Sequence, residues 1–224
     1  MKHSFDAAIF DMDGVLIDTV LLHWKAYNEL LMEWYGVSMP TDELYQIVGM
    51  SLAEQIPILN EKLSITIDAD AFILEANGRK ERAMSALAPK PGVAELLRIL
   101  RAEGIRLGVG TSTSEEVARQ RLESIAIEDY FDTIVGEERV KLHKPDPEVY
   151  LTVAKQLGVA PRRCVVFEDA PSGLSAAIGA GMKTVAIQSS YVPRPMLAKA
   201  NSIIETLEDI TVKRIDALFA EDSS

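Results

Sequence analysis

Five short runs of mainly apolar residues recur along the chain, and polar residues or glycine end each of them. The runs cover residues 7–10, 105–110, 133–135, 164–167 and 184–187. Continuous apolar runs of this length are typical of strands that are buried on both faces, as in a parallel sheet. The pattern therefore predicts a buried sheet, most of whose strands follow residue 90.

Between these runs, apolar residues recur at helical spacing. The pattern at positions 93, 96, 97 and 100 predicts a helix over residues 93–101. Ser112 with Glu115, or Thr113 with Glu116, fits a capping box at the start of a second helix that ends near residue 126. Strand and helix alternate in this way from about residue 90 onward, which predicts a parallel sheet with right-handed crossovers.

Residues 19–88 break this alternation, because their pattern is almost entirely helical. Asp18 or Thr19 can cap a helix that runs to Trp34, and Gly36 can end it. One face of this helix carries Trp24, Tyr27, Leu31 and Trp34. The segment therefore predicts an inserted all-helical domain.

The expected fold is α/β, a doubly wound, Rossmann-like parallel sheet interrupted by a helical cap. Residues 1–16 and 90–224 would form the core domain, and residues 17–89 would form the cap. The two connecting segments would act as a hinge.

The net charge of the chain limits the kinds of molecule that it can bind. It has 34 acidic and 23 basic side chains, a formal net charge of −11, which disfavours binding to nucleic acid and to anionic lipid surfaces. The one cysteine, Cys164, excludes internal disulfides and cysteine-cluster metal sites. No apolar run approaches the roughly 18 residues that span a bilayer, and the start of the chain lacks a signal-peptide pattern. We expect a cytoplasmic protein with no membrane or nucleic-acid partner.

Two acidic pairs follow two of the predicted strands. Asp11 and Asp13 come directly after the first strand, and Glu168 and Asp169 come directly after the fourth. In an open parallel sheet, ligands bind at the carboxyl ends of the strands. If the two strands are neighbours, the four carboxylates converge, and their mutual repulsion requires a cation. Mg²⁺ is the natural occupant, because it takes carboxylate and carbonyl oxygens and makes room for an anionic substrate.

Two further features could serve a phosphate group. The hydroxyls of Thr111, Ser112 and Thr113 follow the strand 105–110 at the start of a helix, which is an anion site or simply a capped helix end. Lys144 lies in a loop with two flanking prolines, and it is either a surface lysine or a cation beside the acidic pairs.

In their order along the chain, these features resemble the four motifs of the haloacid dehalogenase-like hydrolases. The motifs are DMDGVLIDT at 11–19, the hydroxyl of Thr111, Lys144 in KPDP, and Glu168-Asp169 before APSG. The resemblance covers essentially the whole chain, and the helical insertion after the first motif is similar to that of the beta-phosphoglucomutase and phosphoglycolate-phosphatase branch. The second aspartate, Asp13, distinguishes the chain from the dehalogenating branch.

The resemblance implies phosphoryl transfer through a covalent aspartyl phosphate. Asp11 would be the nucleophile, and Asp13 would protonate the leaving alcohol and then activate water. Thr111 would hydrogen-bond the transferring phosphoryl group, and Lys144 would bridge nucleophile and phosphate. Mg²⁺ would be held by Asp11, the backbone carbonyl of Asp13 and Asp169, with the carboxylate of Glu168 as a further or outer ligand.

The resemblance also places substrate selection in the cap. His23 resembles a substrate-side histidine of the mutase relatives, although it could equally be a helix-surface histidine. The segment 49–52 resembles the substrate loop of the cap, but Leu52 stands where the mutase carries an arginine. A mutase must hold a second phosphate, for which a bidentate cation is the obvious device, so this departure favours a phosphatase.

The sequence therefore predicts a Mg²⁺-dependent phosphatase that acts on a small phosphorylated metabolite, such as a sugar phosphate, phosphoglycolate or a nucleotide-like monophosphate. Ser112 and Thr113 would assist in binding the phosphate. A phosphomutase with the same core, a receiver domain and a non-catalytic interaction protein are the alternatives, although a receiver domain is about half this length and has no cap. We expect a monomer or a weak homo-oligomer.

Overall fold

The computed structural model describes residues 3–47, 52–84 and 87–220. The chain forms two compact units. The core unit comprises Met1–Ile17, Ala88–Ser189 and Arg194–Ser224, and the helical unit comprises Asp18–Leu87 and Ser190–Pro193. The core unit continues to residue 17, one residue further than predicted, and the chain returns to it at residue 88, two residues earlier than predicted. Sequence patterning did not predict that 190–193 join the helical unit.

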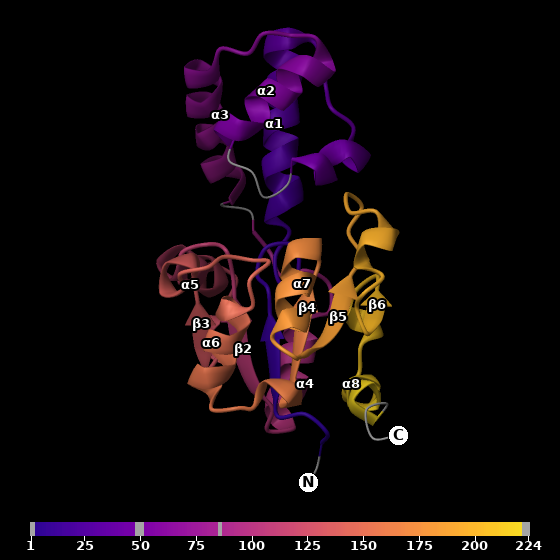
Figure 1. Ribbon diagram of the computed structural model, residues 1–224. Coiled ribbons are helices and arrows are strands. Elements are labelled where there is room, and N and C mark those ends of the chain that lie inside the picture. Colours follow the sequence, from indigo (N-terminus) through magenta and orange to yellow (C-terminus); the bar gives the residue numbers. More distant parts are fainter. Residues whose placement is uncertain (1–2, 48–51, 85–86, 221–224) are drawn as a thin grey trace. The chain divides into compact units, whose positions relative to one another are not determined.

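A parallel sheet forms the centre of the core unit (Figure 1). Its strands are β1 (Ala7–Phe10), β2 (Arg106–Gly110), β3 (Thr133–Val135), β4 (Cys164–Glu168), β5 (Lys183–Ile187) and β6 (Ser202–Ile204). Their order is β3-β2-β1-β4-β5-β6, and each neighbouring pair is parallel. The first five strands match the predicted runs. The sixth was missed because it is three residues long and only its last residue is buried.

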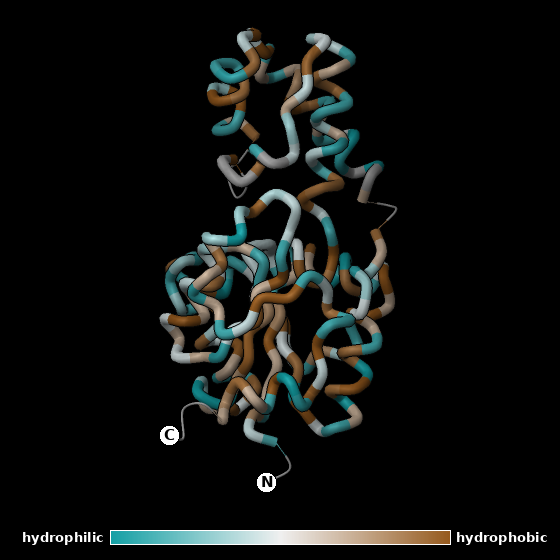
Figure 2. The backbone as a smooth tube through the Cα atoms, turned by 90° about the vertical axis from the view of Figure 1, so that its right-hand side faces the viewer, coloured by the Kyte–Doolittle hydropathy of each residue, from teal (hydrophilic) through white to brown (hydrophobic). Residues whose placement is uncertain are grey.

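Helices cover the two faces of this sheet. They are α4 (Val93–Ala102), α5 (Glu115–Ser124), α6 (Glu148–Leu157), α7 (Pro171–Gly179) and α8 (Val212–Ala220). Short 3-10 turns occupy Glu128–Tyr130, Glu137–Arg139, Pro161–Arg163, Arg194–Leu197 and Leu207–Asp209. In Figure 1, α6 and α7 lie in front of the sheet, where their apolar residues form one buried cluster with β1, β3 and β4. Figure 2 shows the strands as the hydrophobic centre of this unit.

The order of the strands reverses between β1 and β4. From β1 the chain moves outward to β2 and β3, and from β4 it moves to the other edge through β5 and β6. Right-handed connections therefore place α4 and α5 on one face and α6 and α7 on the other. This is the doubly wound arrangement that the sequence predicted, and the reversal is where such sheets bind ligands.

The capping boxes predicted at the start of α5 were wrong. The helix begins two residues later than the first box requires and one residue later than the second, after Ser114, whose side chain makes no capping hydrogen bond. The hydroxyl of Thr113 instead donates to Asp13.

The helical unit contains α1 (Thr19–Tyr35), a 3-10 turn (Thr41–Gln46), α2 (Leu52–Leu63) and α3 (Ala69–Met84). Asp18 caps α1 by accepting a hydrogen bond from the Leu21 amide at 3.3 Å, and Gly36 ends the helix at a φ of 68°. Trp34, on the face of α1 that the sequence pattern singled out, is 40% exposed, and its ring lies nearly perpendicular to that of Phe72. None of the helices in the described residues has both the length and the apolar character to cross a bilayer.

Candidate active site

The adjacency of β1 and β4 brings two distant acidic segments together. Phe10 pairs with Phe167, so Asp11 and Glu168 emerge side by side, and the Asp11 amide donates to the Phe167 carbonyl at 3.0 Å. Asp11, Glu168 and Asp169 are 7%, 1% and 4% exposed. One carboxylate oxygen from each lies within 4.8 Å of the others. We call these three residues the carboxylate group.

Asp13 lies outside the carboxylate group, although the sequence suggested that all four side chains would converge. Its Oδ2 accepts a hydrogen bond from Thr113 Oγ1 at 2.9 Å, and its Oδ1 lies 3.3 Å from Arg121 Nη1. The side chain of Asp13 is 25% exposed. It is therefore directed toward the loop after β2 and toward α5.

Lys144 supplies positive charge to the carboxylate group. Its Nζ donates to Asp11 Oδ1 at 2.6 Å and to Glu168 Oε1 at 2.7 Å, and its side chain is only 8% exposed. The ammonium also lies 4.8 Å from the centre of the Tyr150 ring. The sequence alternative of an ordinary surface lysine is wrong.

Glu168 is held on both oxygens by other groups. Its Oε1 accepts from Lys144 and from the Tyr150 hydroxyl at 2.5 Å, and its Oε2 accepts from the amides of Asp169 and Ala170 at 3.0 and 3.1 Å. These bonds use most of the acceptor capacity of a carboxylate. Glu168 thus serves to hold Lys144 and the turn after β4.

Burial and charge shift the ionisation of these groups. Burial raises the pKa of Asp11 well above its usual value, and the charge of Lys144 opposes this effect. Burial lowers the pKa of Lys144, but the charges and hydrogen bonds of Asp11 and Glu168 outweigh it and hold that pKa above its ordinary value. The ammonium therefore stays charged, and one positive charge faces three carboxyl groups. This excess of oxygen ligands and negative charge suits a hard dication.

Gly14 allows Asp169 to approach the first motif. The φ of Gly14 is +89°, and a Cβ at this position would lie 2.1 Å from Asp169 Oδ2. Any larger residue would therefore displace the carboxylate. The Gly14 carbonyl accepts a hydrogen bond from Lys90 Nζ at 2.6 Å, which fixes the turn after β1.

Comparisons with known proteins agree with this geometry. Residues 8–187 match the family model described as haloacid dehalogenase-like hydrolase. The chain belongs to this family. A phosphorylated carbohydrates phosphatase from Thermotoga maritima is 41% identical over 181 residues, which are 80% of this chain and 83% of that protein.

Two further relatives match this chain over nearly their whole length. The fructose-1-phosphate phosphatase YqaB from Escherichia coli is 34% identical over 193 residues, covering 84% of this chain and 99% of that protein. The crystal structure of a beta-phosphoglucomutase from Clostridium difficile superposes with a TM-score of 0.76 at 26% identity, covering 98% and 99% of the two chains. This haloacid dehalogenase-like hydrolase thus resembles both phosphatases and a mutase.

The loop after β2 carries the predicted phosphate-binding hydroxyls of this hydrolase. Thr111 is 2% exposed, and its Oγ1 accepts from the Thr113 amide at 3.1 Å. Ser112 is exposed, whereas Thr113 is half-buried and bonded to Asp13. The three hydroxyls therefore differ in role: one shapes the loop, one faces solvent and one holds Asp13.

The predicted substrate residues of the cap lie in the helical unit of this hydrolase. His23 is half-buried on α1, and its ring centre lies 6.4 Å from that of Tyr27. Of the predicted substrate loop, positions 49–51 fall outside the described residues, and Leu52 is the first residue of α2.

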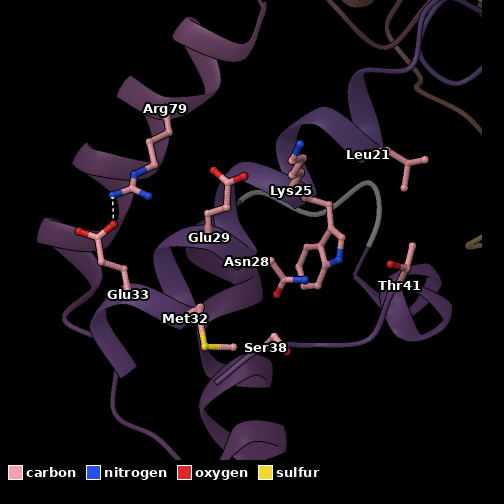
Figure 3. Close-up of a pocket in the computed structure, with 10 residues that line it drawn as sticks. Leu21, Lys25, Asn28, Glu29, Met32, Glu33, Ser38, Thr41 and Arg79 are labelled. Atoms are coloured by element: carbon pink, nitrogen blue, oxygen red, sulfur yellow. Dashed lines mark hydrogen bonds and ion pairs between the residues drawn. The ribbon is translucent and has the colours of Figure 1, made fainter. Parts of the chain in front are cut away.

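The helical unit also contains an open cavity of about 820 Å³ along α1 (Figure 3). Figure 3 shows Arg79 of α3 paired with Glu33 of α1, at 2.6 Å, beside this cavity. Asn28 lines it too, but both ends of its amide are bonded to the main chain of Met39. All the residues that line this cavity belong to the helical unit.

Sequence reasoning missed three residues around this site. Tyr150, Arg121 and Lys90 contact Glu168, Asp13 and Gly14. Tyr150 lies six residues after Lys144, in the first turn of the following helix α6, which is a weak signal. Arg121 and Lys90 lie outside the four motifs, so no local pattern could have found them.

Proposed function

We propose that this chain is a Mg²⁺-dependent phosphatase that hydrolyses a small phosphomonoester through a phosphorylated Asp11. The observation that supports this most strongly is the pairing of a buried Asp11 with Lys144, while Asp13, two residues away, lies apart from the carboxylate group. Asp11 thus lies beside a positive charge that can stabilise a phosphoryl group. Asp13 serves in proton transfer.

The proposed hydrolysis has two steps. First, a carboxylate oxygen of Asp11 attacks phosphorus, the bond from phosphorus to the leaving oxygen breaks, and that oxygen takes a proton from Asp13. Then Asp13 takes a proton from water, whose oxygen attacks phosphorus and releases inorganic phosphate and the free Asp11 carboxylate. Lys144 stays charged throughout and stabilises the anionic oxygens.

The residues present fit a magnesium ion, because the carboxylate group consists of hard oxygen donors with excess negative charge. The carboxylates of Asp11 and Asp169 and the main-chain carbonyl of Asp13 would hold it. When bound, it supplies the positive charge that lets a carboxylate approach an anionic phosphate. Glu168 would act from outside, by holding Lys144, because its own oxygens are engaged.

Sugar phosphates are the first substrates to test. Two relatives are named as phosphatases of phosphorylated carbohydrates and of fructose 1-phosphate. The core residues described above act on the phosphoryl group and on the proton of the leaving oxygen, so we propose that the helical unit, including His23, selects the rest of the leaving group. Phosphoglycolate and nucleotide-like monophosphates remain in the panel. The single cysteine is buried and unpaired, which supports a reducing, cytoplasmic location.

The test measures release of inorganic phosphate from this panel with Mg²⁺ and with chelator. Asp11→Asn should lower kcat by about 1,000-fold or more, because the amide cannot form the acyl phosphate. Asp6→Asn is the matched control, since Asp6 precedes the same strand at its other end and should retain full activity. Asp11→Asn activity close to that of the unmodified enzyme would contradict the proposal. So would conversion of a sugar phosphate to its isomer, dependent on a bisphosphate activator and without phosphate release, which would identify a mutase.

A further inference from the structure

Arg121 of α5 contacts the residue to which the proposed function gives proton transfer. Its Nη1 lies 3.3 Å from Asp13 Oδ1, and its side chain is only 15% exposed. In the part of the chain that the structure describes, Asp13 is the only acidic group within ion-pair distance of this guanidinium. Arg121 is therefore directed to the site and not to the surface.

Its neighbour on the same helix behaves differently. The side chain of Arg119 is 45% exposed and pairs with Glu115 at 3.1 Å and with Glu128 at 2.6 Å. Exposed pairs of this kind contribute little to stability. The two arginines therefore provide an internal comparison, because they share helix, charge and size but only one contacts Asp13.

Arg121 and Thr113 together hold both oxygens of the Asp13 carboxyl. The hydroxyl of Thr113 can donate or accept a hydrogen bond, so it suits Asp13 with or without a proton on Oδ2. A guanidinium can only donate, so Arg121 suits an unprotonated Oδ1. The pair of contacts therefore fixes the orientation of the Asp13 carboxyl.

We propose that Arg121 is a positioning residue for the chemical step. It holds the carboxyl of Asp13 in its orientation toward the loop after β2, outside the carboxylate group. It also stabilises the negative charge that Asp13 acquires as its proton passes to the leaving oxygen. This inference rests on the proposed function, because it presupposes that Asp13 is the general acid.

The leaving group provides the test. An alkoxide, such as that of a sugar, needs the proton as the ester bond breaks, whereas 4-nitrophenolate is stable as an anion and leaves without it. Loss of a residue that acts through Asp13 should therefore slow the first step, transfer of the phosphoryl group to Asp11, far more with fructose 1-phosphate than with 4-nitrophenyl phosphate. The second step, hydrolysis of phosphorylated Asp11, is the same for both esters and also uses Asp13, so the comparison follows the first step alone. A defect of folding or of phosphate binding would slow both alike.

The experiment measures the release of fructose or 4-nitrophenolate in a single turnover, with enzyme in excess over ester, for the unmodified enzyme and four variants. The limiting rate at high enzyme concentration reports the first step, and the enzyme concentration that gives half of this rate reports binding. Arg121→Gln should lower the limiting rate on fructose 1-phosphate by about 10- to 100-fold, part of the 100- to 10,000-fold typical of general acids. It should change the limiting rate on 4-nitrophenyl phosphate by less than about threefold and leave both half-maximal concentrations near their original level. Arg121→Lys should recover part of the loss, Arg119→Gln should leave both rates unchanged, and Asp13→Asn should show the same dependence on leaving group more strongly.

The possible failures are distinguishable. If the unmodified enzyme releases phosphate from neither ester, both the proposed function and this inference are overturned. If Asp13→Asn slows the first step equally with both esters, the role of Asp13 as general acid is wrong, and the inference about Arg121 falls with it. If Asp13→Asn discriminates between the esters in the first step but Arg121→Gln does not, or if Arg121→Gln weakens only binding, the positioning role alone is refuted.

Discussion

Replacing Lys144 by Met tests the electrostatics of the carboxylate group most directly. The change keeps most of the apolar stem of the side chain but removes the ammonium that lies 2.6 Å from Asp11 and 2.7 Å from Glu168. Both carboxylates are then left buried without their cation. Lys141→Met is the matched control, because Lys141 lies three residues earlier in the same segment with an exposed side chain.

The expected loss of stability follows from the burial of all three partners. The side chains of Lys144, Asp11 and Glu168 are 8%, 10% and 1% exposed, so solvent screens the ion pairs very little. Removing one partner of such a buried pair costs about 3–5 kcal/mol. For a protein of this length, about 1 kcal/mol corresponds to roughly 2–4 °C in melting temperature, so we expect a decrease of roughly 6–20 °C.

The assay is thermal unfolding followed by far-ultraviolet circular dichroism in chelator, so that no dication replaces the lost charge. Tryptophan fluorescence would be the wrong probe, because Trp24 and Trp34 both belong to the helical unit. A melting temperature of Lys144→Met within about 2 °C of the unmodified protein would refute the reasoning. The same holds if Lys141→Met lowers it equally.

Three further predictions concern other parts of the core. Gly14→Ala should raise the Mg²⁺ concentration needed for half-maximal activity by at least about tenfold, because the new Cβ would lie 2.1 Å from Asp169 Oδ2. Gly104→Ala, at a φ of +77° but with nothing within 4 Å, has similar backbone strain and should leave this requirement unchanged. Chelation of divalent ions should abolish phosphate release, and added Mg²⁺ should restore it; full activity in chelator would exclude the metal. Asp216 and Glu103 face the two ring nitrogens of His3 and raise its pKa above the ordinary value of about 6.5, so His3→Gln should lower the melting temperature most below that pH. This difference should shrink as the pH rises through the raised pKa, and a difference that grows with pH would contradict the assignment.

Local pattern was enough to predict most of the core unit. The strand β1 consists of four buried apolar residues, and the first four residues of β4 are also apolar and buried. Each strand could therefore be predicted from its own residues, without knowledge of its neighbours in the sheet. The carboxylates that follow them could be assigned to one edge of the sheet, because the strands of a parallel sheet end on the same side. The strand β6 could not be predicted in this way, because it is short and partly exposed and its pattern resembles that of a loop.

The sequence by itself determined which residues could carry the chemistry, since strand ends, residue types and the order of the motifs are local properties. Only the tertiary structure decided which role each of these residues can take. Whether a carboxylate joins a cation site or turns away depends on the donors that face it, and those donors come from distant segments: Lys144 and Tyr150 for Glu168, and Arg121 for Asp13. The separation of Asp13 from the carboxylate group therefore follows from its contacts with Thr113, in the loop after β2, and with Arg121 of α5, and not from the spacing of two aspartates.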